Sequence, residues 1–139
     1  MNILVIDAQG GGIGRQLVAK LLERIPEADI VAAGTNSMAT NAMIKAGAKK
    51  AATGENAIRY CASQAEIITG PIGILVANAM LGEISPAIAE SVGSSTAPKV
   101  LIPTTHCNTI IAGTKALPVK DSIEDAIERI VRIYGGDDN

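Results

Sequence analysis

The chain has 139 residues, of which 47% are hydrophobic and 19% charged, a composition typical of a globular protein with one apolar core. Its 12 basic and 14 acidic residues give a formal net charge of -2, which argues against a nucleic-acid partner because such a partner requires a clustered basic surface. At this length we expect a single domain over residues 1–139. No run approaches the roughly 20 apolar residues of a membrane span and the first strand-like run has no charged leader, so we expect no membrane partner and a cytoplasmic location.

Residues that commonly bind metals or stack on rings are scarce. Cys61 and Cys107 have no paired spacing and His106 is the only histidine, so the sequence predicts no metal site. There are two tyrosines and no Phe or Trp, which removes the aromatic platforms that single-stranded nucleic acids or a flavin ring commonly use. The core must therefore consist of aliphatic side chains.

The first half of the chain alternates strand-like and helix-like segments. Residues 3–6 form a continuous apolar run, which predicts a strand buried on both faces. After a glycine-rich turn, apolar residues recur at helical spacing up to Pro26, which predicts a helix over residues 13–25. The segments that follow predict a strand over 29–33, a helix that ends at Gly47 and a strand over 50–53.

The second half continues the alternation with one ambiguous segment. Residues 72–81 fit either a strand or a buried helix. Ser85 followed by Pro86 predicts a helix start, because the hydroxyl caps the helix and proline suits its first position. The other segments predict a helix over 55–63, strands over 66–69 and 99–103, and a last helix from Asp121 or Ser122 to Tyr134.

This alternation predicts an α/β class, with a three-layer Rossmann-like fold and a mainly parallel sheet of about five strands. Right-handed crossovers give the expected strand order 3-2-1-4-5. In such sheets ligands bind beyond the carboxyl ends of the strands, where the order reverses between the first and fourth strands. Candidate site residues are therefore those that directly follow a strand.

The first strand leads into a turn with four glycines in five residues, between Gly10 and Gly14. Glycines let backbone amides approach a phosphate, and the helix that follows directs its N-terminal dipole at a bound anion. The sequence therefore predicts a phosphate-binding turn rather than a mere connection. The candidate cofactor-binding residues are Ala8, Gln9, Gly10, Gly11, Gly12, Ile13 and Gly14.

This turn resembles the nucleotide-binding turn of the short-chain dehydrogenase superfamily, whose pattern is Gly-x-x-x-Gly-x-Gly. Gly12-Ile13-Gly14 matches its end, and Ala8 replaces its first glycine. The preceding Asp7 would repel a phosphate unless it points away, binds Mg²⁺ or accepts hydrogen bonds from a neighbouring loop, and we favour the loop hydrogen bond.

The second strand is followed by Thr35, Asn36 and Ser37, where an NAD-selective site usually has a carboxylate for the ribose 2′-hydroxyl. With no carboxylate there, the hydroxyls and the amide favour the 2′-phosphate of NADP over NAD, although no arginine is present to clamp that phosphate. The alternative is that Asn36 or Ser37 simply caps a helix.

Residues after the later strands supply the remaining candidates. Thr53 is expected to border an adenine pocket, and Gly70 and Pro71 to let the backbone approach a pyrophosphate or nicotinamide. Asn78 and Glu83 are candidates for the floor of the site or for loop hydrogen bonds. His106 and Cys107 are weak catalytic candidates, because neighbours in an extended chain point to opposite faces and a polar rim is the favoured interpretation.

The dehydrogenase resemblance does not extend to the catalytic Tyr-x-x-x-Lys of that superfamily. Gln64 stands four residues after Tyr60, and Asp138 four after Tyr134, so the activity is not implied. Over its whole length the chain resembles a small bacterial family of unknown function. The segments that carry this resemblance are Asp7 to Gly14, Gly34 to Asn36, Ala52 to Asn56 and Gly70 to Ile74. The resemblance implies a compact Rossmann-like nucleotide binder and no reaction.

Three hypotheses remain open from the sequence. The first is a nucleotide-binding protein that takes NADP(H), NAD(H) or a related nucleotide without chemistry. The second is a small NAD(P)-dependent oxidoreductase in which a second subunit, as in a homodimer, completes the site. The third is a mononucleotide-binding regulatory or partner protein, since five strands supply little more than one nucleotide-binding half.

Overall fold

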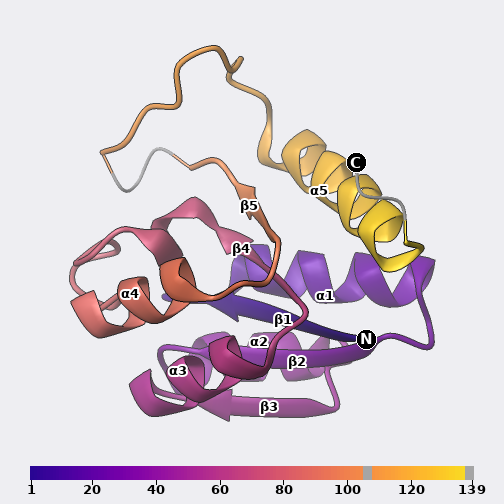
Figure 1. The fold of residues 1–139 in the computed structure, drawn as a ribbon, viewed down its shortest axis with the longest axis horizontal. Helices are drawn as coiled ribbons and strands as arrows, with labels where there is room; N and C mark the ends of the chain where they lie inside the picture. Colours follow the sequence, from indigo (N-terminus) through magenta and orange to yellow (C-terminus); the bar gives the residue numbers. More distant parts are fainter. Residues whose placement is uncertain (105–107, 137–139) are drawn as a thin grey trace.

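A parallel five-stranded sheet in the order β3-β2-β1-β4-β5 forms the centre of the protein (Figure 1). The computed structural model describes residues 1–104 and 108–136. The strands are β1 (Asn2–Asp7), β2 (Asp29–Gly34), β3 (Lys50–Thr53), β4 (Ile67–Pro71) and β5 (Lys99–Ile102). The predicted α/β class and strand order are confirmed.

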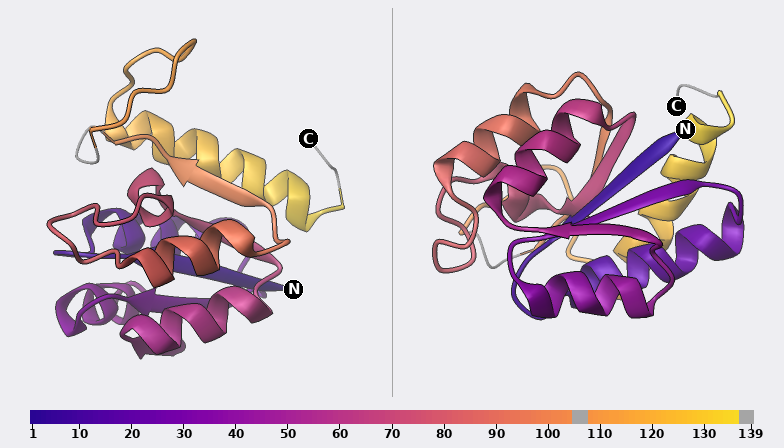
Figure 2. Two further views of the ribbon diagram at one scale, coloured as in Figure 1. Left: turned by 60° about the vertical axis from the view of Figure 1, so that its left-hand side comes forward. Right: turned by 90° about the horizontal axis from the view of Figure 1, so that it is seen from below.

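Helices cover both faces of this sheet, which gives three layers (Figure 2). The helices are α1 (Gly12–Arg24), α2 (Ser37–Lys45), α3 (Glu55–Gln64), the 3-10 turn η1 (Ile72–Leu75), α4 (Pro86–Ser94) and α5 (Val119–Tyr134). One face carries α1, which contacts both α2 and α5, and the other carries α3 and α4, which contact each other. This division follows from right-handed crossovers that run outward from β1 in both directions.

Alternate side chains of β1 pack in two separate aliphatic cores, one on each face of the sheet. Ile3 and Val5 belong to the core beneath α1, α2 and α5, whereas Leu4 and Ile6 belong to the core beneath α3 and α4. Successive side chains of a strand point to opposite faces, so a strand covered on both sides must be apolar throughout. Burial of β1 on both faces therefore explains the continuous apolar run at the start of the sequence.

Two predicted elements differ from the structure. The ambiguous segment is neither strand nor long helix, because η1 is followed by turns in which Asn78, Met80 and Leu81 adopt positive φ. The last helix begins at Val119 after Pro118 and has no side-chain cap, whereas the sequence suggested a cap at Asp121 or Ser122. The carbonyl of Pro118 accepts from the amides of Asp121 and Ser122 at 2.9 and 3.2 Å, so the helix begins with backbone hydrogen bonds in place of a side-chain cap.

The helix α5 also pairs with α1 through charged side chains. Lys20 Nζ lies 2.7 Å from Glu124 Oε1, and Arg24 forms an ion pair with Glu128. None of the helices within the described ranges combines the length and apolar character needed to cross a bilayer.

Candidate functional site

The glycine turn (residues 8–11) connects the carboxyl end of β1 to the N-terminus of α1. Gly11 caps α1 with φ +73, and its amide donates to the carbonyl of Ala8 at 3.0 Å. Gln9 also has positive φ, at 51. Two residues in this conformation reverse the chain within a few residues, which places the start of α1 directly beside the end of β1.

Asp7 lies beneath this turn and is only 4% exposed. Its Oδ1 accepts from the amide of Ala8 at 2.8 Å, and its Oδ2 accepts from the amide of Gly14 at 2.7 Å. Burial raises the pKa of Asp7 above its ordinary value, although the backbone amides lower it in part. The predicted loop hydrogen bond is confirmed, and it occupies two amides that the sequence assigned to a phosphate.

The glycines of this segment divide into two kinds. A Cβ on Gly11 would lie 2.8 Å from the Cα of Ala39, and one on Gly14 would lie 2.7 Å from the Sδ of Met43, so both glycines are required by the packing of α1 against α2. Gly10 and Gly12 have no atom within 4 Å of an added Cβ. Their amides donate to no acceptor in the described part of the chain, so these two donors are available to a ligand.

A hollow of about 290 Å³ lies in front of these free amides. We call it the turn hollow. It is lined by Asp7, Ala8, Gln9, Gly10, Gly11, Gly12, Ile13, Gln16, Pro71, Met80 and Thr104. The lining comes from the carboxyl ends of β1, β4 and β5, the start of α1 and the loop after η1. Ligands of such folds bind at this edge of the sheet, where the strand order reverses between β1 and β4. Its volume is at the small end of the range for small-molecule pockets.

The turn after β2 contains a carboxylate that the sequence did not place there. Glu83 Oε1 accepts from the hydroxyl of Thr35 at 2.6 Å, from the side-chain amide of Asn36 at 3.0 Å and from the backbone amide of Gln9 at 2.8 Å. The premise behind the preference for NADP, that no carboxylate lies beside these residues, is therefore wrong. Glu83 is far from β2 in sequence, and only the path of its loop brings it there.

Burial alone would raise the pKa of Glu83, but the hydrogen bonds from Thr35, Gln9 and Asn36 outweigh it and hold the pKa below its ordinary value. Asn36 also caps α2, since its Oδ1 accepts from the amide of Ala39 at 2.9 Å. The capping alternative is thus confirmed for Asn36. Its Nδ2 donates to the carbonyl of Gln9 at 3.1 Å and joins the two turns.

Ser37 belongs to a neighbouring groove rather than to the turn hollow. This groove, about 490 Å³, lies between α1 and α2 and is lined by Gly10, Arg15, Ser37, Met38, Asn41, Ala42 and Lys45. Arg15 and Lys45, two basic residues of this groove, are not among the candidates that the sequence supplied. Arg15 lies near the start of α1, directly after the glycine turn, which was the available signal, whereas Lys45 lies in the last turn of α2 and has no such signal.

The remaining candidates do not all meet at one place. Pro71 lines the turn hollow, but a Cβ on Gly70 would lie 2.3 Å from the carbonyl oxygen of Ile6, so this glycine is required by the contact between β4 and β1. The hydroxyl of Thr53 lies 2.7 Å from that of Thr40 and joins β3 to α2. His106 and Cys107 lie outside the described residues.

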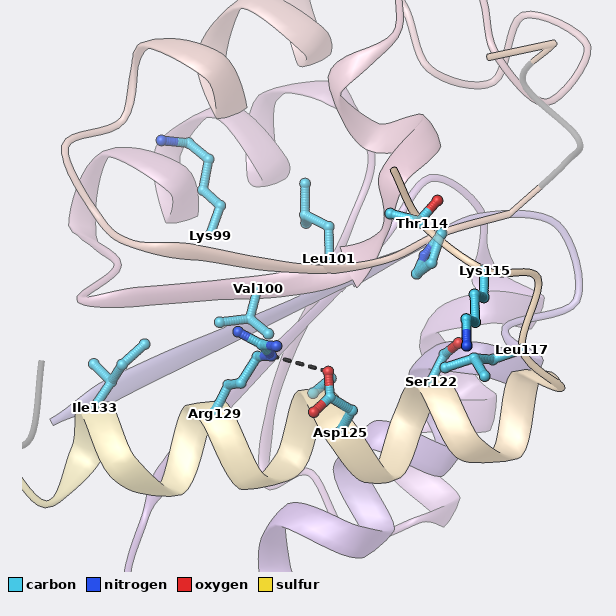
Figure 3. Close-up of a pocket in the computed structure, with 12 residues that line it drawn as sticks. Lys99, Val100, Leu101, Thr114, Lys115, Leu117, Ser122, Asp125, Arg129 and Ile133 are labelled. Atoms are coloured by element: carbon cyan, nitrogen blue, oxygen red, sulfur yellow. Dashed lines mark hydrogen bonds and ion pairs between the residues drawn. The ribbon is translucent and has the colours of Figure 1, made fainter. Parts of the chain in front are cut away.

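A larger hollow of about 660 Å³ lies between β5 and α5 (Figure 3). In it, Arg129 Nε donates to Asp125 Oδ2 at 2.9 Å along α5, opposite Val100 of β5. Because β5 is an edge strand, this hollow opens along the side of the sheet rather than at the carboxyl ends of the central strands. The turn hollow therefore remains the stronger candidate site.

The parallel sheet, its strand order and the glycine turn at the first helix define a Rossmann-like α/β protein. Within this class, the chain belongs to the family described as Domain of unknown function (DUF3842), whose sequence profile matches residues 2–135. The expected membership of a family of unknown function is confirmed. None of the curated proteins matches the sequence.

Two solved structures are similar to this chain at low sequence identity. A dodecameric FMN-dependent Ubix-like decarboxylase from Escherichia coli O157:H7 is 15% identical, with 97% of this chain and 95% of that chain covered and a TM-score of 0.52. Saccharopine dehydrogenase (L-Glu forming) from Saccharomyces cerevisiae is 15% identical, with 90% of this chain and 24% of that chain covered and a TM-score of 0.47. The first of these similarities shows a common fold.

Proposed function

We propose that the chain binds a nucleotide, with a phosphate group at the amides of Gly10 and Gly12 and the rest of the ligand in or beside the turn hollow. The observation that carries this proposal is the pair of free amides beside a hollow at the reversal of strand order. Free amides at a helix N-terminus suit an anion, because the helix dipole adds a partial positive charge there.

Asp7 does not defeat this proposal, although its carboxyl group lines the same hollow. Each of its oxygens accepts a hydrogen bond from a backbone amide, and the partial positive charge of these amides offsets part of the negative charge of the carboxylate. These hydrogen bonds weaken the repulsion between Asp7 and a bound phosphate. The amides of Gly10 and Gly12 donate to neither Asp7 nor Glu83.

The ligand candidates are NAD(H), NADP(H) and mononucleotides. The turn hollow has room for part of a dinucleotide, and the remainder would extend over the turn after β2, where Thr35 and Asn36 lie. Gly10 borders both the turn hollow and the adjoining groove of Arg15, so a phosphate at its amide has access to either side. The FMN dependence named for the decarboxylase of similar fold is consistent with a nucleotide ligand, and no reaction is proposed for this chain.

Gly12→Val tests the site, because its side chain enters open space and should block the ligand without disturbing the fold. We expect the dissociation constant of the nucleotide to rise by about tenfold or more through loss of the amide contact. The measurement is isothermal titration calorimetry, after a thermal-shift panel of NAD, NADP, ATP, FMN and FAD selects the ligand. A ligand at about 100 times its dissociation constant stabilises the folded protein by about 2.7 kcal/mol.

The matched control is Gly93→Val. Gly93 also lies in a helix, α4, and its added Cβ meets only Leu75 at 3.9 Å. This control should bind as the wild type does. Equal affinities for wild type and Gly12→Val, or no stabilisation by any nucleotide in the panel, would remove the proposal.

A further inference from the structure

Glu83 contacts residues at the end of β2, a strand that is not adjacent to β4, the last strand before Glu83 in the chain. It follows η1, after β4, and yet it binds the residues directly after β2. In the sheet, β1 lies between β4 and β2, so the loop of Glu83 passes over the end of β1. The hydrogen bond from the amide of Gln9 fixes it to the glycine turn on the way.

The loop that carries Glu83 is held by its own backbone. The amide of Asn78 donates to the carbonyl of Ile84 at 2.7 Å, and the amide of Gly82 donates to the carbonyl of Asn78 at 3.1 Å. Asn78, Met80 and Leu81 adopt positive φ, a conformation that non-glycine residues rarely keep without support from surrounding structure. These backbone hydrogen bonds define the position from which Glu83 contacts the two turns.

We infer that Glu83 recognises the ribose of the bound nucleotide, so that the protein selects nucleotides with a free 2′-hydroxyl over those with a 2′-phosphate. This inference rests on the proposed nucleotide site. Oε1 is saturated by three donors, whereas Oε2 accepts no hydrogen bond from the described residues. A ribose hydroxyl can donate to Oε2, and a 2′-phosphate cannot.

The position and the charge of Glu83 both support this assignment. The amide that Glu83 uses belongs to Gln9, and the next amide along the chain, that of Gly10, is one of the two proposed phosphate donors. The Cα atoms of adjacent residues are about 3.8 Å apart. A ribose esterified to a phosphate at the amide of Gly10 therefore lies within reach of the Glu83 carboxylate. Because its hydrogen bonds keep Glu83 ionised, a 2′-phosphate placed beside it would be repelled.

Arg15 and Lys45 define the competing arrangement. Both line the groove beyond Ser37, which Glu83 does not line, and both would attract a 2′-phosphate. That arrangement requires the ribose to turn away from Thr35 and Glu83. The two arrangements predict opposite preferences between NAD and NADP, which makes them separable by experiment.

The test is isothermal titration calorimetry of the whole chain with four probes: NAD, NADP, 5′-AMP and 2′-deoxy-5′-AMP. We expect wild-type protein to bind NAD about tenfold more tightly than NADP, and 5′-AMP about tenfold more tightly than its deoxy form, as for one charged hydrogen bond. Glu83→Gln keeps the size of the side chain and should remove most of both differences. Glu27→Gln, in an exposed turn, is the matched control and should keep them.

The outcomes separate this inference from the site on which it rests. Binding that depends on Gly12 but is equal for both AMP forms, or stronger for NADP and weakened by Arg15→Gln, overturns the role of Glu83 and leaves the nucleotide site in place. No binding of any probe overturns both. The wild-type ratios test the inference even if Glu83→Gln lowers the melting temperature.

Discussion

At the scale of single residues, the turn after β1 is organised by carboxylates as much as by glycines. Asp7 binds the amides of Ala8 and Gly14 from below, and Glu83 binds the amide of Gln9 from the side. Burial raises the pKa of Asp7, and the negative charge of Glu83 adds to this increase. The amides available to a ligand are those that remain after these internal acceptors are satisfied.

Asp7→Asn should change how stability depends on pH. The folded-state pKa of Asp7 is raised above 3.8, so the folded protein binds this proton more tightly than the unfolded chain, and stability falls as the pH rises from about 3.8 to the folded pKa. The Asp7→Asn variant should lack this decline in stability with rising pH. Urea unfolding at a series of pH values, followed by circular dichroism, measures the free energy of unfolding of both proteins.

Asp121→Asn, at an exposed carboxylate in the first turn of α5, is the control and should retain the decline. Parallel pH profiles for wild type and Asp7→Asn would contradict the effect of burial on Asp7. Asparagine can accept only one of the two hydrogen bonds, so a uniform loss of stability at every pH is expected in addition.

The glycine pattern and the polar residues after each strand predicted where the candidate site lies, but not how each residue is used. Gly10 and Gly12 look identical to Gly11 and Gly14 in the sequence, and only the packing against Ala39 and Met43 distinguishes them. The sequence also does not show that the hydroxyl of Thr35 donates to Glu83. Contacts between residues about 50 positions apart depend on the path of a loop, which local patterns do not encode.

At the scale of elements, α2 illustrates how one side chain connects several segments. Asn36 caps α2, donates to the carbonyl of Gln9 and donates to Glu83. The end of β2, the glycine turn and the loop after η1 therefore meet at this one amide. Loss of Asn36 should affect both the helix and the neighbouring site.

Asn36→Ala should lower the free energy of unfolding by about 1 kcal/mol through the lost cap alone, and by more where the other two bonds contribute. Thermal and urea unfolding measure this loss. The matched control is Asn41→Ala, at an exposed position in the same helix, where the higher helix propensity of alanine should leave stability unchanged or slightly increased. Equal effects of the two substitutions would contradict the role of Asn36.

The regular elements were predictable because their local signals agree with their tertiary environment. Parallel strands covered on both faces must be apolar throughout, and helices on a sheet must repeat their apolar residues at helical spacing. Residues 72–81 are also apolar, and yet they form η1 and a loop with positive φ at Asn78, Met80 and Leu81. An apolar composition indicates that a segment is buried, but it does not determine the conformation of that segment.

At the scale of the whole molecule, one sheet separates two aliphatic cores. The core of α1, α2 and α5 includes Leu21 and Ile127, and the core of α3 and α4 includes Ile58 and Ile88. The strands contribute side chains to both cores, so neither face can lose its packing without exposing the sheet. We therefore expect the chain to unfold as a single domain.

Leu21→Ala and Ile88→Ala, one in each core, should each lower the free energy of unfolding by about 2–5 kcal/mol. Each variant should still show one cooperative transition by circular dichroism and by calorimetry, with equal calorimetric and van't Hoff enthalpies. Ile44→Ala, at a side chain that is 46% exposed, is the control and should have a small effect. Two separate transitions in either core variant would contradict a single domain.

The loop between η1 and α4 adds a consequence for how this protein family can diversify. Because Glu83 is carried by a connecting segment and not by a strand, insertions or deletions there would shift the acidic group while leaving the five-stranded scaffold intact. Relatives that keep the same sheet but differ in the length of this connection should therefore prefer different ligands, and loop length would be the variable to compare among them.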